Sequence, residues 1–261
     1  MASTSRCLLL LDLQNEFLSP GGHFPIHESS QTFLDGMHKL VYAFRSAGNP
    51  IFWVRSEYEN TGTRPQGDDG DASNILSGTH IGRKPCCAKG STGAEFPENI
   101  AALISASSPQ SENVIITKTW YSAFKETTLL TDLRNRGITE LYVGGLMTNV
   151  CVIATVTRAQ ELAFNVKVVE DCLGWRKRES HERALQNMRS LPVQVVSSQN
   201  VIRNIQGVEA PIVESPIPRI PMLYYVNGSI PSWRVLMSLY EKVRLSSDVH
   251  LSSFNDRPFM N

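Results

Sequence analysis

The chain has 261 residues, 41% of them hydrophobic, and its 25 lysines and arginines are balanced by 25 aspartates and glutamates. That length can bury a full core and favours one large domain with additions over two equal domains. The sequence pI is about 7.0 and no long run of like charge occurs. We therefore expect no nucleic-acid partner and no polyanion-binding surface.

Cysteine usage indicates the compartment. The sequence holds five cysteines, Cys7, Cys86, Cys87, Cys151 and Cys172. An odd number without paired spacing argues against a disulfide framework and for a reducing compartment, and the adjacent pair lacks the usual zinc spacing. The apolar run at residues 7–11 is too short for a membrane span or a signal segment. A cytoplasmic protein without a membrane partner is expected.

Apolar runs of strand length alternate with helical patterns along most of the chain. Strands are predicted at residues 7–11, 50–54, 113–117, from 140, 166–169 and 193–196. Helices are predicted at about residues 30–47, 97–104, 126–136, after Cys151, and at 179–189. This alternation predicts a three-layer α/β domain with a six-stranded, mostly parallel sheet in residues 1–205.

Two segments depart from this alternation. Residues 55–95 form an irregular stretch far longer than ordinary connections in compact domains, which favours a functional or disordered loop. Residues 206–261 begin with the proline-rich IVESPIPRIP and contain a predicted helix at about 231–244 with one apolar face. We expect this appendage to pack on the domain or on a partner subunit.

Three potentially reactive side chains follow three of the predicted strands. Asp12 follows the first strand, Lys118 the third, and Cys151 lies in the turn after the strand that begins at residue 140. In parallel α/β sheets, functional residues gather at the carboxyl ends of the strands. We therefore expect the three on one rim of the sheet, although the strand order cannot be derived from the sequence.

These residue types together can cleave an amide. Cys151 stands at the start of a predicted helix, where the helix dipole is expected to lower its thiol pKa. Asp12 can act as the general base, and Lys118 favours the charged forms of both neighbours. Backbone N–H groups of Met147 and Cys151 would stabilise the oxyanion. Taken singly, each side chain has an ordinary interpretation: a buried thiol, a capping aspartate, a solvated lysine.

Three motifs carry a resemblance to a known family. They are LLLLDLQNEF with Asp12, ITKTWYSAF with Lys118, and VGGLMTNVCV with Cys151. Over about residues 5–200 the sequence resembles the isochorismatase-like cysteine hydrolases, which include nicotinamidases and N-carbamoylsarcosine amidohydrolases. The resemblance implies a Rossmann-like hydrolase fold, an Asp–Lys–Cys catalytic triad and a homo-oligomer, either a dimer or a tetramer. It also implies a cis peptide at Leu146-Met147.

Departures from the family narrow the function. Nicotinamidases carry a metal-binding Asp–x–His segment after the second strand, whereas this chain has VRSEYENTG there, without histidine. We predict no catalytic metal and no cofactor. Isochorismatases proper cleave a vinyl ether by acid catalysis and lack the nucleophilic cysteine, so Cys151 argues against that reaction without excluding it. A non-catalytic binding protein on the same fold is the alternative from another class.

The predicted substrate is a small molecule with a non-peptide C–N bond in an amide, carbamoyl or lactam group. The expected substrate-binding residues are Gln14, Phe17, Arg55, Glu57, Tyr58, Trp120, Tyr121, Phe124 and Thr148. The aromatic set suggests a flat or partly apolar substrate. Ordinary packing is an equal alternative for Phe17 and Phe124, and surface charge is the default for Arg55 and Glu57.

Overall fold

The computed structural model describes residues 5–22, 24–27, 32–58, 86–106, 111–207, 222–225 and 250–253. The chain divides into two compact units, residues 1–210 and residues 211–261. In the second unit, β7 (Met222–Tyr225) and β8 (His250–Ser253) pair in parallel. The helix predicted at 231–244 lies outside the described residues, and the packing of residues 206–261 stays a prediction.

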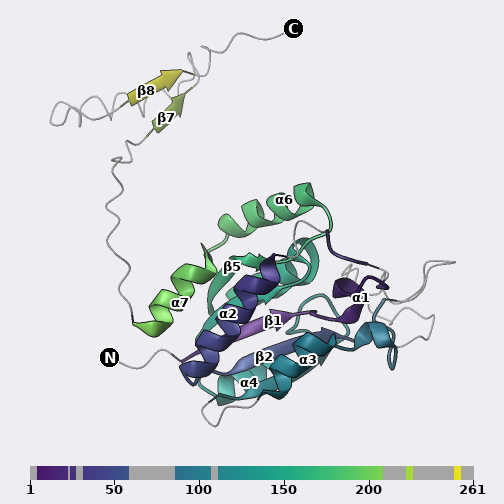
Figure 1. The fold of residues 1–261 in the computed structure, drawn as a ribbon. Helices are drawn as coiled ribbons and strands as arrows, with labels where there is room; N and C mark the ends of the chain where they lie inside the picture. Colours follow the sequence, from purple (N-terminus) through teal and green to yellow (C-terminus); the bar gives the residue numbers. More distant parts are fainter. Residues whose placement is uncertain are drawn as a thin grey trace, which may run out of the picture. The chain divides into compact units, whose positions relative to one another are not determined.

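The first unit is built on one six-stranded sheet (Figure 1). Its strands are β1 (Arg6–Leu11), β2 (Ile51–Ser56), β3 (Asn113–Lys118), β4 (Glu140–Gly145), β5 (Asn165–Leu173) and β6 (Gln194–Val196). They lie in the order β3-β2-β1-β4-β5-β6, and every neighbouring pair is parallel. The predicted α/β class and the six strands are confirmed.

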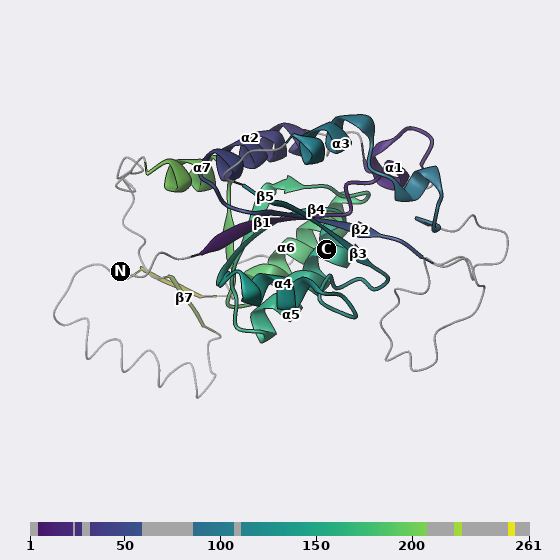
Figure 2. The same cartoon turned by 90° about the horizontal axis from the view of Figure 1, so that it is seen from below.

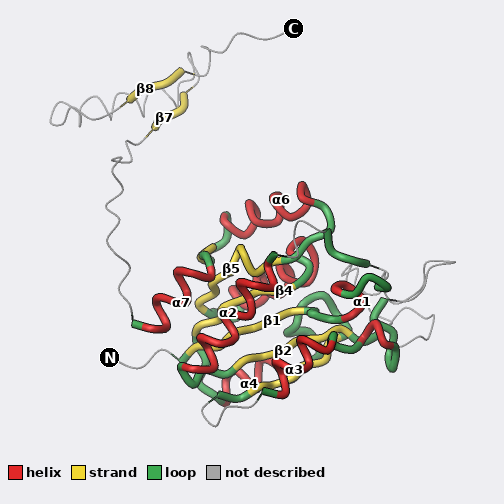
Figure 3. The backbone as a smooth tube through the Cα atoms, in the orientation of Figure 1, coloured by secondary structure: helices red, strands yellow, loops and turns green. Residues whose placement is uncertain are grey.

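Helices cover both faces of this sheet, as Figure 2 shows. On one face lie α2 (Phe33–Ser46), α3 (Glu98–Ser105) and α7 (Ser198–Gln206); on the other lie α4 (Leu129–Asn135), α5 (Ile153–Glu161) and α6 (Arg178–Arg189). The alternation of helix and strand along the backbone can be followed in Figure 3. None of the helices that the structure describes is both long and apolar enough to cross a lipid bilayer.

The position of β1 inside the sheet explains why its sequence is an unbroken apolar run. Cys7, Leu9 and Leu11 pack into the core beneath α4, α5 and α6, while Leu8 and Leu10 pack into the core beneath α2 and α3. All five are at most 1% exposed. A central parallel strand has no solvent face, so the alternation typical of half-exposed strands disappears.

The strand order reverses direction between β1 and β4, and ligands of such sheets bind in the crevice at this point. Leu11 pairs with Gly145 there. Gly145 has φ +110°, and a Cβ added to it would lie 2.2 Å from the carbonyl oxygen of Leu11. Only glycine allows this approach. Asp12 follows with φ +55°, a left-handed conformation that aspartate tolerates better than most residues.

Several elements differ from the sequence expectations. α1 (Asn15–Leu18) is a single turn, too short for a periodic pattern to reveal it. α7 was overlooked, although Ser197 caps its first turn and the left-handed Gly207 ends it. The segment Thr148–Val152 forms one π-helical turn before α5 begins.

The prediction of a cis peptide at Leu146-Met147 is wrong, because no peptide bond among the described residues is cis. Hydrogen bonds anchor the chain on both sides of this position. The N–H of Leu146 donates to the Leu11 carbonyl at 2.8 Å, and the N–H of Thr148 donates to the Gly174 carbonyl at 3.2 Å. The turn is therefore tied to β1 on one side and to the end of β5 on the other.

Candidate active site

Cys151 sits in the π-helical turn after β4, directly beyond the strand crossover. Its side chain is buried, with 6% of the residue exposed. The ammonium nitrogen Nζ of Lys118 lies 3.3 Å from its Sγ and donates a hydrogen bond to it. The nucleophile expected from the sequence therefore has a cation in direct contact.

Asp12 completes the group. Its Oδ2 lies 3.0 Å from Lys118 Nζ, and the two side chains are 1% and 0% exposed, respectively. This contact is a buried ion pair between the carboxylate and the ammonium. Oδ1 accepts a hydrogen bond from Ser56 Oγ at 2.8 Å. Asp12, Lys118 and Cys151 thus converge, as the resemblance implies.

Ser56 is a member of this group that the sequence analysis missed. Lys118 ends β3, two strands away from β1, and neighbouring strands lie about 4.8 Å apart. The lysine must therefore extend past the end of β2, where Ser56 is its register partner. Nζ donates to Ser56 Oγ at 2.6 Å, and Oγ donates in turn to Asp12. The serine fixes the two charged groups relative to each other.

The environment of Cys151 contradicts the expected low thiol pKa. Burial raises the pKa of Cys151, and the Asp12 carboxylate raises it further, while Lys118 opposes both. For Lys118, burial disfavours the charge, but Asp12 and Cys151 bring the net pKa above its usual value. Burial and Asp12 thus favour the neutral thiol of Cys151, while Lys118 favours its thiolate.

A pocket of about 720 Å³ opens onto Asp12 and Cys151. Phe17, Tyr121 and Met147, expected near the substrate, line it. Its remaining described lining residues are Phe24, Pro25, Ile26, His27, Asn149, Val150, Arg176, Lys177 and Ser180. None of these residues is among the expected site residues. Arg176 and Lys177 nevertheless follow the end of β5, and functional residues gather at the carboxyl ends of parallel strands, where Lys118 also lies.

Comparison with known families shows to which family this chain belongs. The model of the isochorismatase domain matches residues 6–200. The chain belongs to the isochorismatase domain family. It is 25% identical over 211 residues to ureidoacrylate amidohydrolase RutB of Acinetobacter baylyi, covering 79% of this chain and 86% of that protein. It is 27% identical over 189 residues to an Arabidopsis thaliana protein named "Probable inactive nicotinamidase", covering 71% and 89%, respectively.

Solved structures agree with the fold. Nicotinamidase PncA from Bacillus subtilis superimposes with a TM-score of 0.61 and 26% sequence identity, covering 74% of this chain and 99% of that one. The covered length corresponds to the α/β unit with the six-stranded sheet. The isochorismatase fold inferred from three short motifs is thus confirmed.

Some residues predicted to bind substrate in this isochorismatase family member make structural contacts within the protein. Gln14 is fully buried, and its amide nitrogen donates at 2.7 Å to the carbonyls of both Ser56 and Ala94. Thr148 is also fully buried; its hydroxyl donates to the Gly174 carbonyl at 3.1 Å and lies 2.8 Å from His181 Nδ1. Neither residue lines the pocket, and a substrate role for them stays a prediction.

Arg55, Glu57 and Tyr58 also lie away from the pocket lining. Arg55 forms ion pairs with Glu57 and Glu95, each at 3.5 Å, so two carboxylates already face its guanidinium. Tyr58 is 3% exposed, and its hydroxyl has no hydrogen-bond partner among the described residues. Burial raises the pKa of Tyr58, and the nearby Cys151 and Asp12 raise it further while Lys118 lowers it.

The two remaining aromatic residues of the prediction are packed. Lys125 Nζ stands 3.4 Å from the ring centroid of Trp120, a cation–π contact. Phe124 stacks on Phe164 with centroids 5.9 Å apart, inside the core under α4 and α5. Phe124 thus makes the core contacts that ordinary packing, the alternative to substrate binding, would give it.

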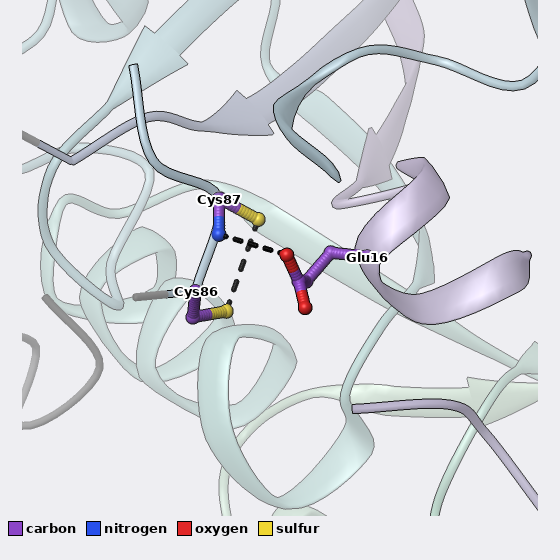
Figure 4. Close-up of side chains that lie close together, drawn as sticks. All are labelled: Glu16, Cys86 and Cys87. Atoms are coloured by element: carbon purple, nitrogen blue, oxygen red, sulfur yellow. Dashed lines mark hydrogen bonds between the residues drawn. The ribbon is translucent and has the colours of Figure 1, made fainter. Parts of the chain in front are cut away.

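Two places in the described residues bear on metal binding. At the end of β2, where the resemblance gives nicotinamidases Asp–x–His, Ser56 and Tyr58 offer only hydroxyls, which do not fit such a site. Elsewhere, buried Glu16, Cys86 and Cys87 bring ligand atoms within 4.8 Å of one another, and their side chains face each other in Figure 4. The Cys87 N–H donates to Glu16 Oε2 at 3.2 Å. The absence of a catalytic metal stays a prediction.

Proposed function

We propose that this protein is a cysteine hydrolase that cleaves a non-peptide C–N bond of a small amide, carbamoyl or lactam compound. The observation that carries the proposal is the convergence of Asp12, Lys118 and Cys151, of which Asp12 and Cys151 line one pocket. The names of two relatives, an amidohydrolase and a nicotinamidase, give it further support.

The first half-reaction starts from a protonated thiol, so the proton must leave as sulfur attacks. Asp12 takes the proton while Cys151 Sγ bonds to the carbonyl carbon, and the charge of Lys118 stabilises the developing anions. Backbone N–H groups of Met147 and Cys151 are the proposed donors to the oxyanion. Protonated Asp12 then gives its proton to the leaving nitrogen, the C–N bond of the tetrahedral intermediate breaks, and ammonia or an amine departs, which leaves a thioester on Cys151.

Water completes the second half-reaction. The Asp12 carboxylate removes a proton from water, whose oxygen attacks the thioester carbon. Collapse of this intermediate breaks the C–S bond, and the Asp12 proton restores the thiol. One water is consumed, and one carboxylic acid and one amine are formed. Ser56 donates to Asp12 Oδ1, so we assign both proton transfers to the other oxygen, Oδ2, which faces Lys118.

Two rivals have specific support. The family model takes its description from isochorismatase, whose vinyl-ether cleavage needs an acid and no thiol. One relative bears a name that includes "inactive", which supports a binding protein on the same fold. Neither rival needs Cys151 beside both Lys118 and Asp12. We further propose that the protein is cytoplasmic and forms a homo-oligomer. Light scattering on the purified full chain would test the oligomeric state.

The deciding experiment measures ammonia or amine release from a panel of small amides, ureas and lactams. Wild type is compared with Cys151→Ala, and Cys7→Ala serves as the matched control because that thiol is fully buried in β1. Turnover that vanishes only in Cys151→Ala supports the proposal. Vinyl-ether cleavage retained in both variants, without amide turnover, would instead assign the reaction to Asp12 as an acid.

A further inference from the structure

His181 lies in the first turn of α6 and contacts the segment that carries the proposed nucleophile. Its ring nitrogen Nδ1 lies 2.8 Å from the hydroxyl oxygen Oγ1 of Thr148. Thr148 is the first residue of the π-helical turn Thr148–Val152, which holds Cys151 and is called the nucleophile turn below. Neither His181 nor Thr148 lines the pocket, so the proposed reaction gives them no direct part.

The hydrogen bond between these two side chains has a defined direction. Thr148 Oγ1 lies 3.1 Å from the Gly174 carbonyl oxygen and donates to it. A hydroxyl has one proton and a carbonyl has none to give, so the Thr148 proton is committed to Gly174. The 2.8 Å contact with His181 needs a second proton, which Nδ1 must supply. His181 is therefore the donor, and its neutral ring carries the proton on Nδ1.

Thr148 in turn fixes the backbone around the thiol. It is fully buried, and its N–H donates to the Gly174 carbonyl at 3.2 Å. Its own carbonyl accepts the N–H of Ile153, which closes the nucleophile turn around Cys151. The sulfur of Cys151 lies 3.3 Å from Lys118 Nζ. A displacement of Thr148 therefore moves the sulfur relative to its cation.

The ring of His181 is held in position by its own neighbours. Trp175 packs against it at a tilt, with ring centroids 5.7 Å apart. The backbone N–H of His181 donates to the Lys177 carbonyl at 3.1 Å. A protonated imidazole also carries a proton on Nδ1, so protonation of His181 keeps the donor to Thr148. The link between α6 and the nucleophile turn thus exists in both charge states of the histidine.

We propose that His181 is a positioning residue: through Thr148 it holds the nucleophile turn where the sulfur of Cys151 meets Lys118. The inference rests on the proposed function for the reaction that this turn serves. A misplacement of about 1 Å can cost a catalytic group about 100-fold in rate. Because His181 and Thr148 lie outside the pocket lining, the loss is expected in kcat and not in KM.

Nitrogen-15 NMR of the histidine side chains tests the direction of the bond without turnover. At pH 8 the His181 ring of wild type is expected to carry its proton on Nδ1, whereas neutral histidine in water prefers Nε2. His181→Asn removes the signal and so assigns it. Thr148→Val removes the acceptor and should return the proton to Nε2. A wild-type His181 ring that carries its proton on Nε2 overturns the inference.

The kinetic test compares two variants that differ in the donor they offer. In His181→Asn the amide nitrogen can replace Nδ1, since both atoms are bonded to Cγ, whereas His181→Phe keeps a ring and loses the donor. For an amide that wild type hydrolyses, kcat is expected to fall about 10- to 100-fold in His181→Phe, with KM near its wild-type value. His181→Asn should recover much of kcat. Equal losses in both variants, or a change in KM alone, contradict positioning.

Two comparisons separate positioning from a general loosening of α6. Leu185→Val shortens a core side chain of the same helix and removes no hydrogen bond to Thr148, so its kcat should equal that of wild type. In the Thr148→Val background, His181→Phe should have no further effect on kcat, because the bond is already absent. A loss in Leu185→Val as large as in His181→Phe, or a further loss in the double variant, overturns the inference.

Amide hydrogen exchange decides the inference if wild type hydrolyses no amide. The N–H groups of Val150 and Val152 donate to the Met147 carbonyl at 2.9 and 3.3 Å, within the nucleophile turn and at its start. Their exchange should be about 3- to 10-fold faster in His181→Phe and near the wild-type rate in His181→Asn. Faster exchange without turnover would mean that the proposed function fails while the anchoring by His181 stands. Unchanged exchange in His181→Phe overturns the anchoring.

Discussion

Leu11 and Gly145 face each other across the pairing of β1 and β4, close enough that the Leu146 N–H donates to the Leu11 carbonyl at 2.8 Å. The next residue on β1 is Asp12, and the next segment on β4 is the turn that carries Cys151. Residues that are far apart in the sequence are thereby placed side by side by one backbone contact. The position of the proposed catalytic group therefore depends on a contact between backbones as well as on side chains.

Gly145→Ala should destabilise the protein severely. The added Cβ would meet the Leu11 carbonyl oxygen at 2.2 Å, and φ +110° is unfavourable for alanine. We expect a loss of about 2–5 kcal/mol in the free energy of unfolding, measured by urea denaturation. Gly207→Ala is the control: φ is +68°, but nothing lies within 4 Å, so about 1–2 kcal/mol is expected. Equal losses would contradict the argument.

Ser56→Ala should impair the reaction more than the fold. It removes the donor to Asp12 Oδ1 and an acceptor for Lys118 Nζ, and we expect kcat to fall about 10- to 100-fold. The pH profile of kcat should shift, since the hydroxyl contacts both ionised groups. Ser56→Thr, which keeps a hydroxyl, should recover part of the rate. An unaltered pH profile in Ser56→Ala would reduce the serine to a packing role.

Asp12→Asn should make the thiol more reactive while abolishing hydrolysis. After burial, the Asp12 carboxylate is the main cause that raises the pKa of Cys151, so its removal lowers that pKa and increases the thiolate fraction at a given pH. Iodoacetamide should alkylate Cys151 faster in the variant than in wild type at pH 8. Amide turnover should fall by about 10²- to 10⁴-fold, the range of general acid–base catalysis.

Cys7 supplies the internal reference for that experiment. Burial alone raises its pKa, so its alkylation should not respond to Asp12→Asn in the folded protein. Lys118 lowers the pKa of Cys151, and Lys118→Met should therefore slow alkylation at the same site. Slower alkylation in Asp12→Asn would show that the carboxylate acts mainly by removing the thiol proton rather than by its charge.

Breaking the buried ion pair should reduce stability markedly. Lys118→Met leaves Asp12 without its cation at 1% exposure, and such losses amount to about 3–5 kcal/mol. The exposed pair of Arg158 and Glu161 gives the comparison: Arg158→Met should change stability by less than about 1 kcal/mol. Urea denaturation of both variants measures the two losses in the free energy of unfolding. Similar small changes in both would mean that water enters the pocket and solvates the carboxylate.

His181 should make stability depend on pH. Burial lowers the pKa of His181 in the folded protein, so the unfolded chain binds the proton more readily. The contribution of neutral His181 to the free energy of unfolding is complete above the pKa of the unfolded chain, near 6.5. It is lost as pH falls through the lower pKa of the folded protein. Relative to His181→Gln, wild type should therefore lose stability between pH 7 and pH 5. A difference that is constant over this range would contradict the assignment.

Much of the fold followed from the sequence because apolar runs and helical spacing record burial directly. β1 was recognised from residues 7–11 and the three motifs located Asp12, Lys118 and Cys151. Strand order, in contrast, is set by pairing between distant segments and leaves no local pattern. Ser56 escaped notice because a serine at a strand end has no distinguishing neighbours, and its importance arises only when β2 lies between β1 and β3.

The thiol pKa shows a different limit of sequence reasoning. The position of Cys151 near a helix start suggested a lowered value, but burial and the charge of Asp12 depend on the assembled pocket. Gln14 and Arg55 were named for substrate binding from their places beside the motifs. Their partners, Ala94 and Glu95, lie some eighty and forty residues further along the chain, and sequence proximity could not reveal them.

The hydrogen bonds of Gln14 have a consequence for how this protein can diversify. Its amide joins Ser56 to Ala94, and Tyr58 exchanges backbone hydrogen bonds with Cys87 and Lys89 at 3.0 and 2.9 Å. Both ends of the intervening stretch are therefore anchored to the sheet. The same amide of Gln14 holds both Ser56, which donates to Asp12, and Ala94, so replacing Gln14 would disturb both contacts at once. Change at Gln14 is therefore constrained by the proposed catalytic group, although its side chain does not line the pocket.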